Sequence, residues 1–89
     1  MTGISSWYSY FEGQAAAGPA LRAALGPHWR GRRVIACLAG DNYRSASDNC
    51  VTVALTDFMR ADRLIDLDSR SFSRLAPLSQ GLQEVTISW

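Results

Sequence analysis

Residues 50–56 read Cys-Val-Thr-Val-Ala-Leu-Thr, a stretch that alternates apolar side chains with polar or small ones. Val51, Val53 and Leu55 would share one face of an extended strand, and the even-numbered residues would share the other. A period of two residues is typical of a strand with one buried face. The stretch therefore predicts a β-strand packed against a core.

Four other segments have the same β-rich character. Residues 84–89 alternate in the same way, and the segments 4–9, 33–38 and 63–67 are short and rich in β-branched or aromatic residues. Residues 39–49 are polar and turn-rich, which predicts a hairpin loop between the strands on either side. No internal repeat is evident in the sequence.

Two short helices are predicted between these strands. The first spans residues 19–25, with a proline at its allowed N-terminal position and Gly26 at its end. The second follows Asp68, a good N-cap, and runs to Leu75 before Pro77. Phe72, Leu75 and Ala76 would form its apolar face. Short strands with two small helices favour a closed barrel, which leaves no free strand edge.

The two cysteines, Cys37 and Cys50, lie in apolar surroundings with twelve residues between them. A disulfide closing that loop would stabilise the fold by roughly 3 kcal/mol, a useful amount for so small a core. The alternative is two buried free thiols in a cytosolic protein. We favour the disulfide, which indicates an oxidising, extracytoplasmic setting.

The chain length and net charge limit the classes of function that fit this sequence. The 89 residues predict a single domain, 1–89. Nine basic and eight acidic residues are interspersed, for a net charge of +1, which argues against a nucleic-acid partner. Apolar runs fall short of the roughly 18 residues of a membrane helix, so no membrane insertion is expected. Residues 1–11 lack the features of a secretory signal.

The sequence suggests neither a metal nor a cofactor. One histidine and two well-separated cysteines do not have the spacing of a metal site. Glycine-rich phosphate-binding loops are also absent from the sequence. We therefore expect no cofactor.

Several motifs, in this order along the chain, resemble the rare lipoprotein A (RlpA)-like family. They are Ser-Trp-Tyr at 6–8, Ala-Ala-Ala-Gly at 15–18, Trp-Arg-Gly-Arg-Arg-Val at 29–34, Val-Thr-Val-Ala-Leu-Thr-Asp at 51–57, Arg-Leu-Ile-Asp-Leu at 63–67 and Glu-Val-Thr-Ile at 84–87. The resemblance implies a six-stranded double-psi β-barrel, as in expansins and barwin-like proteins. It also implies a groove for polysaccharide and, in some members, lytic transglycosylase action on peptidoglycan.

The sequence departs from the family pattern at three places. Gly18-Pro19 stands where catalytic members have Gly-Glu, so that acid is missing. Phe58-Met59-Arg60 follows Asp57 where the family has Arg-Gly-Pro. Leu25 occupies the place of a family histidine, and His28 follows three residues later. These departures leave it open whether the protein is an enzyme.

Asp57 is the candidate catalytic residue. It continues the odd-numbered parity of the preceding strand, so its side chain is predicted to begin on the core-facing side. Apolar walls would disfavour its charged form, as suits a general acid/base. Transglycosylase chemistry can use one carboxyl group because a sugar hydroxyl replaces water as the attacking group. The alternative is an aspartate that caps the turn after a strand.

Asp66, Tyr8 and Phe58 are the candidate substrate-binding residues. The resemblance places Asp66 in the family's Ile-Asp-Leu motif, where it could orient sugar hydroxyls; the alternative is that it holds the turn before the second helix. Tyr8 and Phe58 are the aromatic residues chosen to line a groove, whereas most other aromatic residues are predicted to be core. Arg30 belongs to a small basic cluster, 30–33, which is either solvated surface or a contact for acidic peptide stems.

Two functions follow from these observations. The first is a domain that binds the glycan strands of peptidoglycan, with or without transglycosylase cleavage by Asp57. The second is a non-catalytic interaction module, such as a phage tail or capsid component that retains the barrel and contacts other virion or envelope proteins. The expected location is extracytoplasmic or in a virion.

Overall fold

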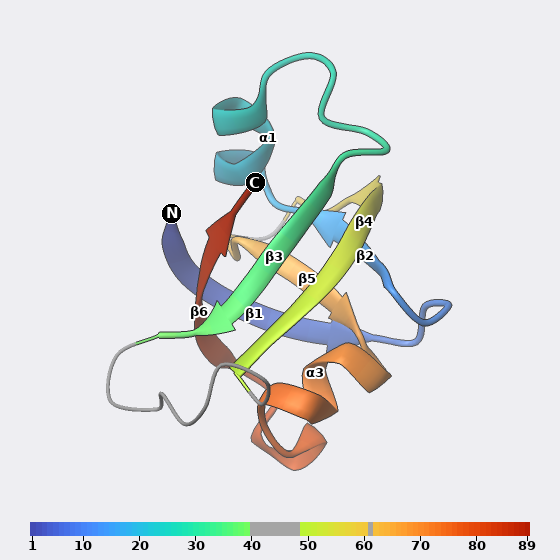
Figure 1. The fold of residues 1–89 in the computed structure, drawn as a ribbon, viewed down its shortest axis with the longest axis vertical. Coiled ribbons are helices and arrows are strands. Elements are labelled where there is room, and N and C mark those ends of the chain that lie inside the picture. Colours follow the sequence, from blue (N-terminus) through green and yellow to red (C-terminus); the bar gives the residue numbers. More distant parts are fainter. Residues whose placement is uncertain (40–48, 61) are drawn as a thin grey trace.

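The computed structural model describes residues 1–39, 49–60 and 62–89. Within these residues the chain forms six strands, two α-helices and one short 3-10 helix (Figure 1). In order they are β1 (Thr2–Tyr8), β2 (Gln14–Ala17), α1 (Pro19–Leu25), β3 (Arg33–Leu38), β4 (Cys50–Phe58), β5 (Ile65–Asp68), α3 (Ser69–Leu75), η2 (Leu78–Gln80) and β6 (Gln83–Ser88).

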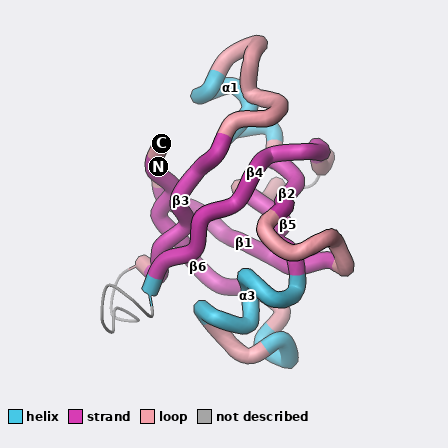
Figure 2. The backbone as a smooth tube through the Cα atoms, turned by 45° about the vertical axis from the view of Figure 1, so that its right-hand side comes forward, coloured by secondary structure: helices cyan, strands magenta, loops and turns pink. Residues whose placement is uncertain are grey.

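The strands close into a barrel, as predicted from the sequence. Their order around the barrel is β1-β5-β2-β4-β3-β6, and β6 pairs with β1 to complete the circle. Helices α1 and α3 lie at opposite ends of the barrel (Figures 1 and 2). None of the helices in the described part of the chain is long and apolar enough to span a membrane.

The barrel consists of two equivalent halves. β1 runs parallel to β5, and β4 runs parallel to β2, whereas β2 with β5 and β3 with β6 are antiparallel. Exchanging β1 with β4, β2 with β5 and β3 with β6 leaves this pairing unchanged. A helix follows the second strand of each half. The fold therefore contains an internal twofold repeat that was not evident in the sequence.

The alternation in β4 is confirmed. Val51, Val53 and Leu55 are buried in the core, while Thr52 and Thr56 are exposed. Each such apolar side chain contributes roughly 1.5–3 kcal/mol when fully buried. The same pattern holds in β6, except that the strand ends at Ser88. Trp89 lies beyond the ladder and is 54% exposed, contrary to the prediction that it continues the buried face.

The predicted helices are also confirmed. Phe72, Leu75 and Ala76 form the buried face of α3. Asp68 caps this helix: its carboxylate accepts hydrogen bonds from the backbone N–H of Ser71 at 2.9 Å and from the Ser71 hydroxyl at 2.6 Å. A third hydrogen bond, from the backbone N–H of Gly13, ties the loop before β2 to the same carboxylate.

Strand β2 was not predicted from its residues, because three consecutive alanines have low strand propensity. All three are fully buried. The next residue, Gly18, explains why small residues are needed here: a Cβ at this position would lie 1.8 Å from the backbone oxygen of Arg63. The backbone N–H of Gly18 instead donates to the oxygen of Leu64 at 2.9 Å. Close contact between two main chains therefore fixes the end of β2.

Cys37 and Cys50 face each other in the antiparallel β3–β4 pair and form the predicted disulfide. The antiparallel pairing agrees with a hairpin between these strands. Residues 40–48 of the predicted hairpin loop lie outside the described residues. The disulfide joins the last strand of the first half to the first strand of the second.

Candidate functional site

The end of β4 carries a β-bulge that determines the position of Asp57. In the parallel pairing with β2, Ala15 aligns with Leu55 but Ala16 aligns with Asp57, so Thr56 is an extra residue. An extra residue inverts the alternation of side chains along a strand. The prediction that Asp57 begins on the core-facing side is therefore wrong, and its side chain is exposed.

The bulge aligns Asp57 with a row of side chains that crosses four strands. Ser6 pairs with Asp66, Asp66 pairs with Ala16, and Ala16 pairs with Asp57. Paired residues point to the same side of a sheet. Because the neighbours of Ala16 on β2 belong to the core, this row lies on the outer side of the sheet. Within it Ser6, Asp66 and Ala16 are covered, at 3%, 9% and 0% exposure, and Asp57 is exposed. With strands about 4.8 Å apart, the two aspartate Cα atoms are separated by roughly 10 Å.

Asp66 is the buried carboxylate of this row. Its side chain is 9% exposed, and its Oδ1 accepts a hydrogen bond of 2.7 Å from the hydroxyl of Ser6. The hydrogen bonds at the start of α3 go to Asp68, which has the role that the alternative interpretation assigned to Asp66. The hydrogen bond from Ser6 thus holds the Asp66 side chain on the outer side of the sheet.

Tyr10 lies close to both aspartates. Burial raises the pKa of its phenol above the ordinary value of 10.0, and the negative charges of Asp66 and Asp57 raise it further. The Tyr8 phenol and a side-chain hydrogen bond with Asp66 act in the same direction. Since a raised pKa favours the protonated phenol, Tyr10 presents a hydroxyl and not a phenolate to this surface.

An open hollow of about 500 Å³ lies beside this row. Its lining combines aromatic rings with hydroxyl, amide and carboxylate groups, and comprises Ser9, Tyr10, Phe11, Gln14, Thr56, Asp57 and Ser69. Tyr8 stands next to it, with its ring centroid 5.3 Å from that of Tyr10 and the two planes inclined at 49°. Tyr8 is 61% exposed and Phe11 is 81% exposed, so two large rings border the hollow. We call this hollow, together with Tyr8 and Asp66, the groove.

Phe58 does not line the groove. Its ring lies between two guanidinium groups, with the Cζ of Arg22 at 5.1 Å and that of Arg60 at 6.0 Å from its centroid. It follows Asp57 directly, so it stands at the β4 border of the groove and faces the α1 end of the barrel.

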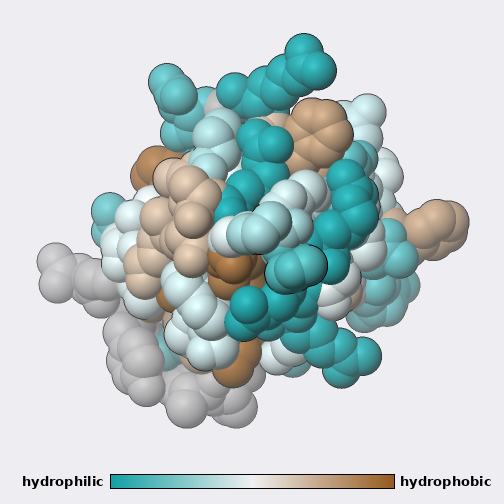
Figure 3. Space-filling view, turned by 90° about the horizontal axis from the view of Figure 1, so that it is seen from above, coloured by the Kyte–Doolittle hydropathy of each residue, from teal (hydrophilic) through white to brown (hydrophobic). Residues whose placement is uncertain are grey.

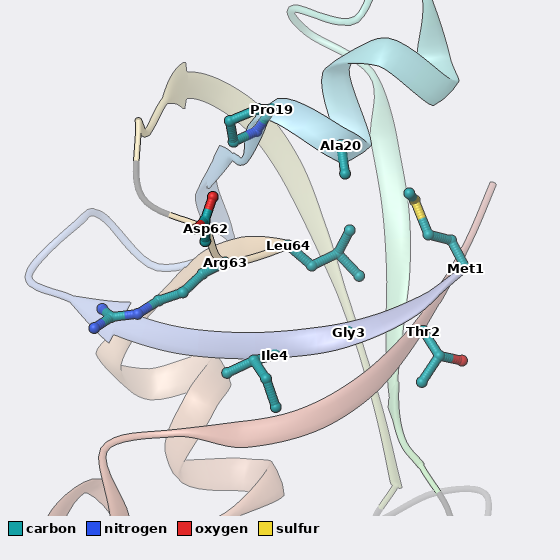
Figure 4. A pocket seen from close by; sticks show the side chains of 9 residues that line it. All are labelled: Met1, Thr2, Gly3, Ile4, Pro19, Ala20, Asp62, Arg63 and Leu64. Atoms are coloured by element: carbon teal, nitrogen blue, oxygen red, sulfur yellow. The ribbon is translucent and has the colours of Figure 1, made fainter.

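A second hollow, of about 320 Å³, lies between the start of β1, the start of α1 and residues 62–64. Met1, Ile4 and Leu64 give it apolar walls (Figure 4). Of its two charged lining residues, Arg63 extends away from the other side chains (Figure 4). Because it has no aromatic lining on which a sugar ring could pack, this hollow is less suited to a sugar than the groove is.

No cluster of three histidine, cysteine or carboxylate side chains suited to a metal occurs among the described residues. His28 is exposed in the turn after α1, and Leu25 packs against the core. Neither of these positions belongs to the groove lining.

The structure brings together three of the four predicted site residues. Tyr8, Asp57 and Asp66 all interact with the Tyr10 phenol, whereas Phe58 lies apart. The sequence interpretation did not single out Tyr10 or Ser6. Ser6 shares the β1 parity of Tyr8, and this could have been read from the sequence. The position of Tyr10 depends on the turn after β1, which carries no periodic signal.

Neither a family model nor a curated protein sequence matches the chain. Two solved structures are similar to it. Streptomyces papain inhibitor has 22% sequence identity and a TM-score of 0.66, covering 100% of this chain and 94% of the inhibitor. A mutant expansin of Clavibacter michiganensis, in complex with cellohexaose, has 14% identity and a TM-score of 0.71. That match covers 99% of this chain and 50% of the expansin chain.

Both similar structures are double-psi β-barrels of the expansin/barwin-like type. The six-stranded double-psi barrel that the sequence resemblance implied is therefore confirmed. At these identities the similarity concerns the fold.

Proposed function

We propose that this domain binds polysaccharide in the groove. The observation that carries the proposal is the open hollow lined by Tyr10, Phe11 and Asp57, with the exposed ring of Tyr8 beside it. The axial C–H groups of a pyranose ring pack on aromatic faces, and its hydroxyls need hydrogen-bonding partners around the rim. The groove offers both kinds of contact.

Each groove residue has a definite part in this proposal. Tyr8 provides the exposed ring on which a sugar stacks, and the Tyr10 hydroxyl offers a hydrogen bond. The carboxylates of Asp66 and Asp57 accept hydrogen bonds from sugar hydroxyls.

One comparison and one feature of the structure support this proposal. The expansin was solved with cellohexaose, so one protein that contains a barrel of this type binds a β-linked glucan. The Cys37–Cys50 disulfide supports an extracytoplasmic location, where cell-wall glycans are found. Within this class, we propose the glycan strand of peptidoglycan as the polysaccharide.

Binding is tested by sedimentation with insoluble cell walls and with cellulose. Tyr8→Ala removes the stacking ring and should weaken binding about tenfold, as expected for the loss of an exposed aromatic contact. Leu82→Ala is the matched control, because Leu82 is also exposed, at 46%, and lies outside the groove lining. Equal binding by the two variants would contradict the proposal.

Cleavage is a separate measurement. The exposed position of Asp57 removes the argument from apolar walls, yet Asp57 lines the hollow and remains the proposed general acid/base. Digestion of purified peptidoglycan should yield anhydro-muropeptides, and Asp57→Asn should abolish them. Binding should weaken at most a few-fold, because asparagine keeps one acceptor oxygen for a sugar hydroxyl. Loss of the products in Asp66→Asn alone would move the role to Asp66. A wild-type protein that binds walls and releases no product is a binding module.

A second candidate function is inhibition of a cysteine protease. The papain inhibitor matches nearly its whole length to this chain, and Phe11 projects a large apolar ring from the loop after β1. Titration of papain with the domain tests this function, and Phe11→Ala should weaken any inhibition. Inhibition without wall binding would replace our first proposal. If neither activity is found, the domain is an interaction module, such as a virion component.

A further inference from the structure

Five side chains at the α1 end of the barrel alternate between arginine and aromatic residues. In order they are Arg30, Trp29, Arg22, Phe58 and Arg60. The guanidinium Cζ atoms lie 4.7 and 6.0 Å from the Trp29 centroid and 5.1 and 6.0 Å from the Phe58 centroid. These distances are within the range of cation–π contacts. We call this set the arginine–aromatic ladder.

The ladder carries three positive charges without a carboxylate partner. Among the described residues, the structure shows one ion pair, between Arg70 and Glu12, and it involves no ladder residue. Arg22 and Arg30 donate instead to the backbone oxygens of Met59 and Thr56. Seen from the α1 end, much of the molecular face is strongly hydrophilic, with hydrophobic side chains between the polar ones (Figure 3).

The guanidinium groups of the ladder remain able to bind an anion. Each guanidinium has five N–H donors, and the backbone hydrogen bonds of Arg22 and Arg30 do not use them all. Those donors match the two oxygens of a carboxylate. The rings and backbone oxygens already restrict the arginine side chains. These side chains therefore lose less conformational entropy when a ligand binds.

The ladder adjoins the groove at β4. Thr56 lines the groove, and its backbone oxygen accepts the 2.6 Å hydrogen bond from Arg30. Asp57 also lines the groove, and the next residue, Phe58, is the centre of one half of the ladder. A polymer lying in the groove and crossing the end of β4 would therefore pass from the aspartates to the arginines.

We propose that the ladder binds carboxylate groups carried on the polysaccharide chain, so that the domain prefers an acidic glycan to a neutral one. This inference rests on the proposed function, because it assigns the class of polysaccharide that the groove accepts. The ring faces and hydroxyls of the sugar contact Tyr8 and the aspartates, and the carboxylates of the residues that cross the end of β4 pair with Arg30 and Arg60.

The test compares polygalacturonate with its fully methyl-esterified form, which has the same backbone and carries uncharged methyl esters in place of the carboxylates. We expect polygalacturonate to bind more tightly, with an affinity that falls as salt is added. Arg30→Gln and Arg60→Gln should each reduce its affinity about three- to fivefold, as for an exposed ion pair, and leave the ester unaffected. Arg60→Lys should lie in between, since it keeps the charge and loses the fork of donors.

Arg74→Gln is the matched control, because it removes an exposed arginine from α3 at the opposite end of the barrel. Arg22 is left in place, since it also bonds to the backbone of Gly18 and Met59. Equal affinity for the two polymers, or equal losses in the Arg60 and Arg74 variants, would overturn the inference.

The two proposals fail in different ways. If both polymers bind equally and Tyr8→Ala weakens both, the groove proposal stands and the ladder inference is wrong. If neither polymer binds, the ladder inference is wrong, and sedimentation with cell walls and cellulose decides the groove proposal. If polygalacturonate binding depends on the arginines and is indifferent to Tyr8→Ala, the ladder binds acidic polymers by itself and the groove proposal fails.

Discussion

The two halves of the barrel share one topology and differ in chemistry at equivalent positions. The internal twofold axis passes through the β2–β5 pair, where Ala16 of the first half faces Asp66 of the second. At this position one half supplies a carboxylate, and the other supplies a methyl group that is fully buried. The groove lies where the two halves have different residues at equivalent positions.

The caps of the two helices differ in the same way. Gly18 precedes α1 and makes no side-chain cap, whereas Asp68 precedes α3 and caps it with its carboxylate. The backbone oxygen of Arg63 occupies the space that a side chain of residue 18 would need. Asp68 is buried, at 1% exposure, and holds both α3 and the loop at Gly13. The first half therefore has no side-chain cap on its helix, because the main chains pack closely at Gly18.

The largest effect is expected from Gly18→Ala. The added methyl group would collide with a backbone oxygen that cannot move without displacing β5, so we expect a loss of about 4 kcal/mol or more in the free energy of unfolding. Gly26→Ala is the control: its φ of +85° is strained for alanine but its surroundings are open. It should cost about 1–2 kcal/mol in denaturant unfolding. Similar losses in the two variants would contradict the close-packing account.

Removal of the disulfide is expected to have the next largest effect, because it joins the halves. The double variant Cys37→Ala/Cys50→Ala should lose about 3 kcal/mol, the value for closing a loop of this length. Chemical denaturation of the variant and of the oxidised wild type gives the difference. A change below about 1 kcal/mol would mean that the β3–β4 pairing holds the halves without the covalent bond.

A smaller loss is expected from Asp68→Ala, about 2 kcal/mol, from the loss of a buried cap with three hydrogen bonds. Asp68→Asn retains one acceptor oxygen and should lose less. Thermal and denaturant unfolding give the two values. If the alanine and asparagine variants are equally stable, the capping role assigned to this carboxylate is wrong.

The smallest effect concerns the titration of Tyr10. Asp66→Asn removes a negative charge and should lower the pKa of Tyr10 toward 10.0, measured from phenolate absorbance with Tyr10→Phe as the subtraction. Because folding raises this pKa, the stabilisation is present below pH 10.0 and is lost as the pH rises through the folded value. An unchanged or higher pKa in Asp66→Asn would show that Asp66 does not act on Tyr10.

Regular alternation and helix signals made much of the fold predictable. The pattern of β4, the Pro19 and Asp68 helix starts and the cysteine pair each depend on neighbouring residues in the sequence, so each was predicted correctly. β2 was not predicted as a strand. Its alanines are needed for close packing against another segment of the chain, and the sequence around them contains no pattern that indicates this packing.

The site was less predictable for the same reason. The β-bulge at Thr56 arises from pairing with a strand about forty residues earlier, and it turns Asp57 outward against the parity of its own strand. Tyr10 reaches the aspartates through a turn without periodicity. The choice of Tyr8 and Asp66 depended on resemblance to a family, and only the strand register shows that they lie on one face.

The most direct test of the account is nuclear magnetic resonance mapping of the folded domain during titration with a soluble oligosaccharide of peptidoglycan or cellulose. We predict that the largest shifts occur at Tyr8, Tyr10, Asp57 and Asp66, with the residues around Met1 and Leu64 unchanged. Shifts concentrated at the second hollow, around Met1 and Leu64, or no shifts at saturating sugar, would contradict the claim that the groove is a glycan-binding surface.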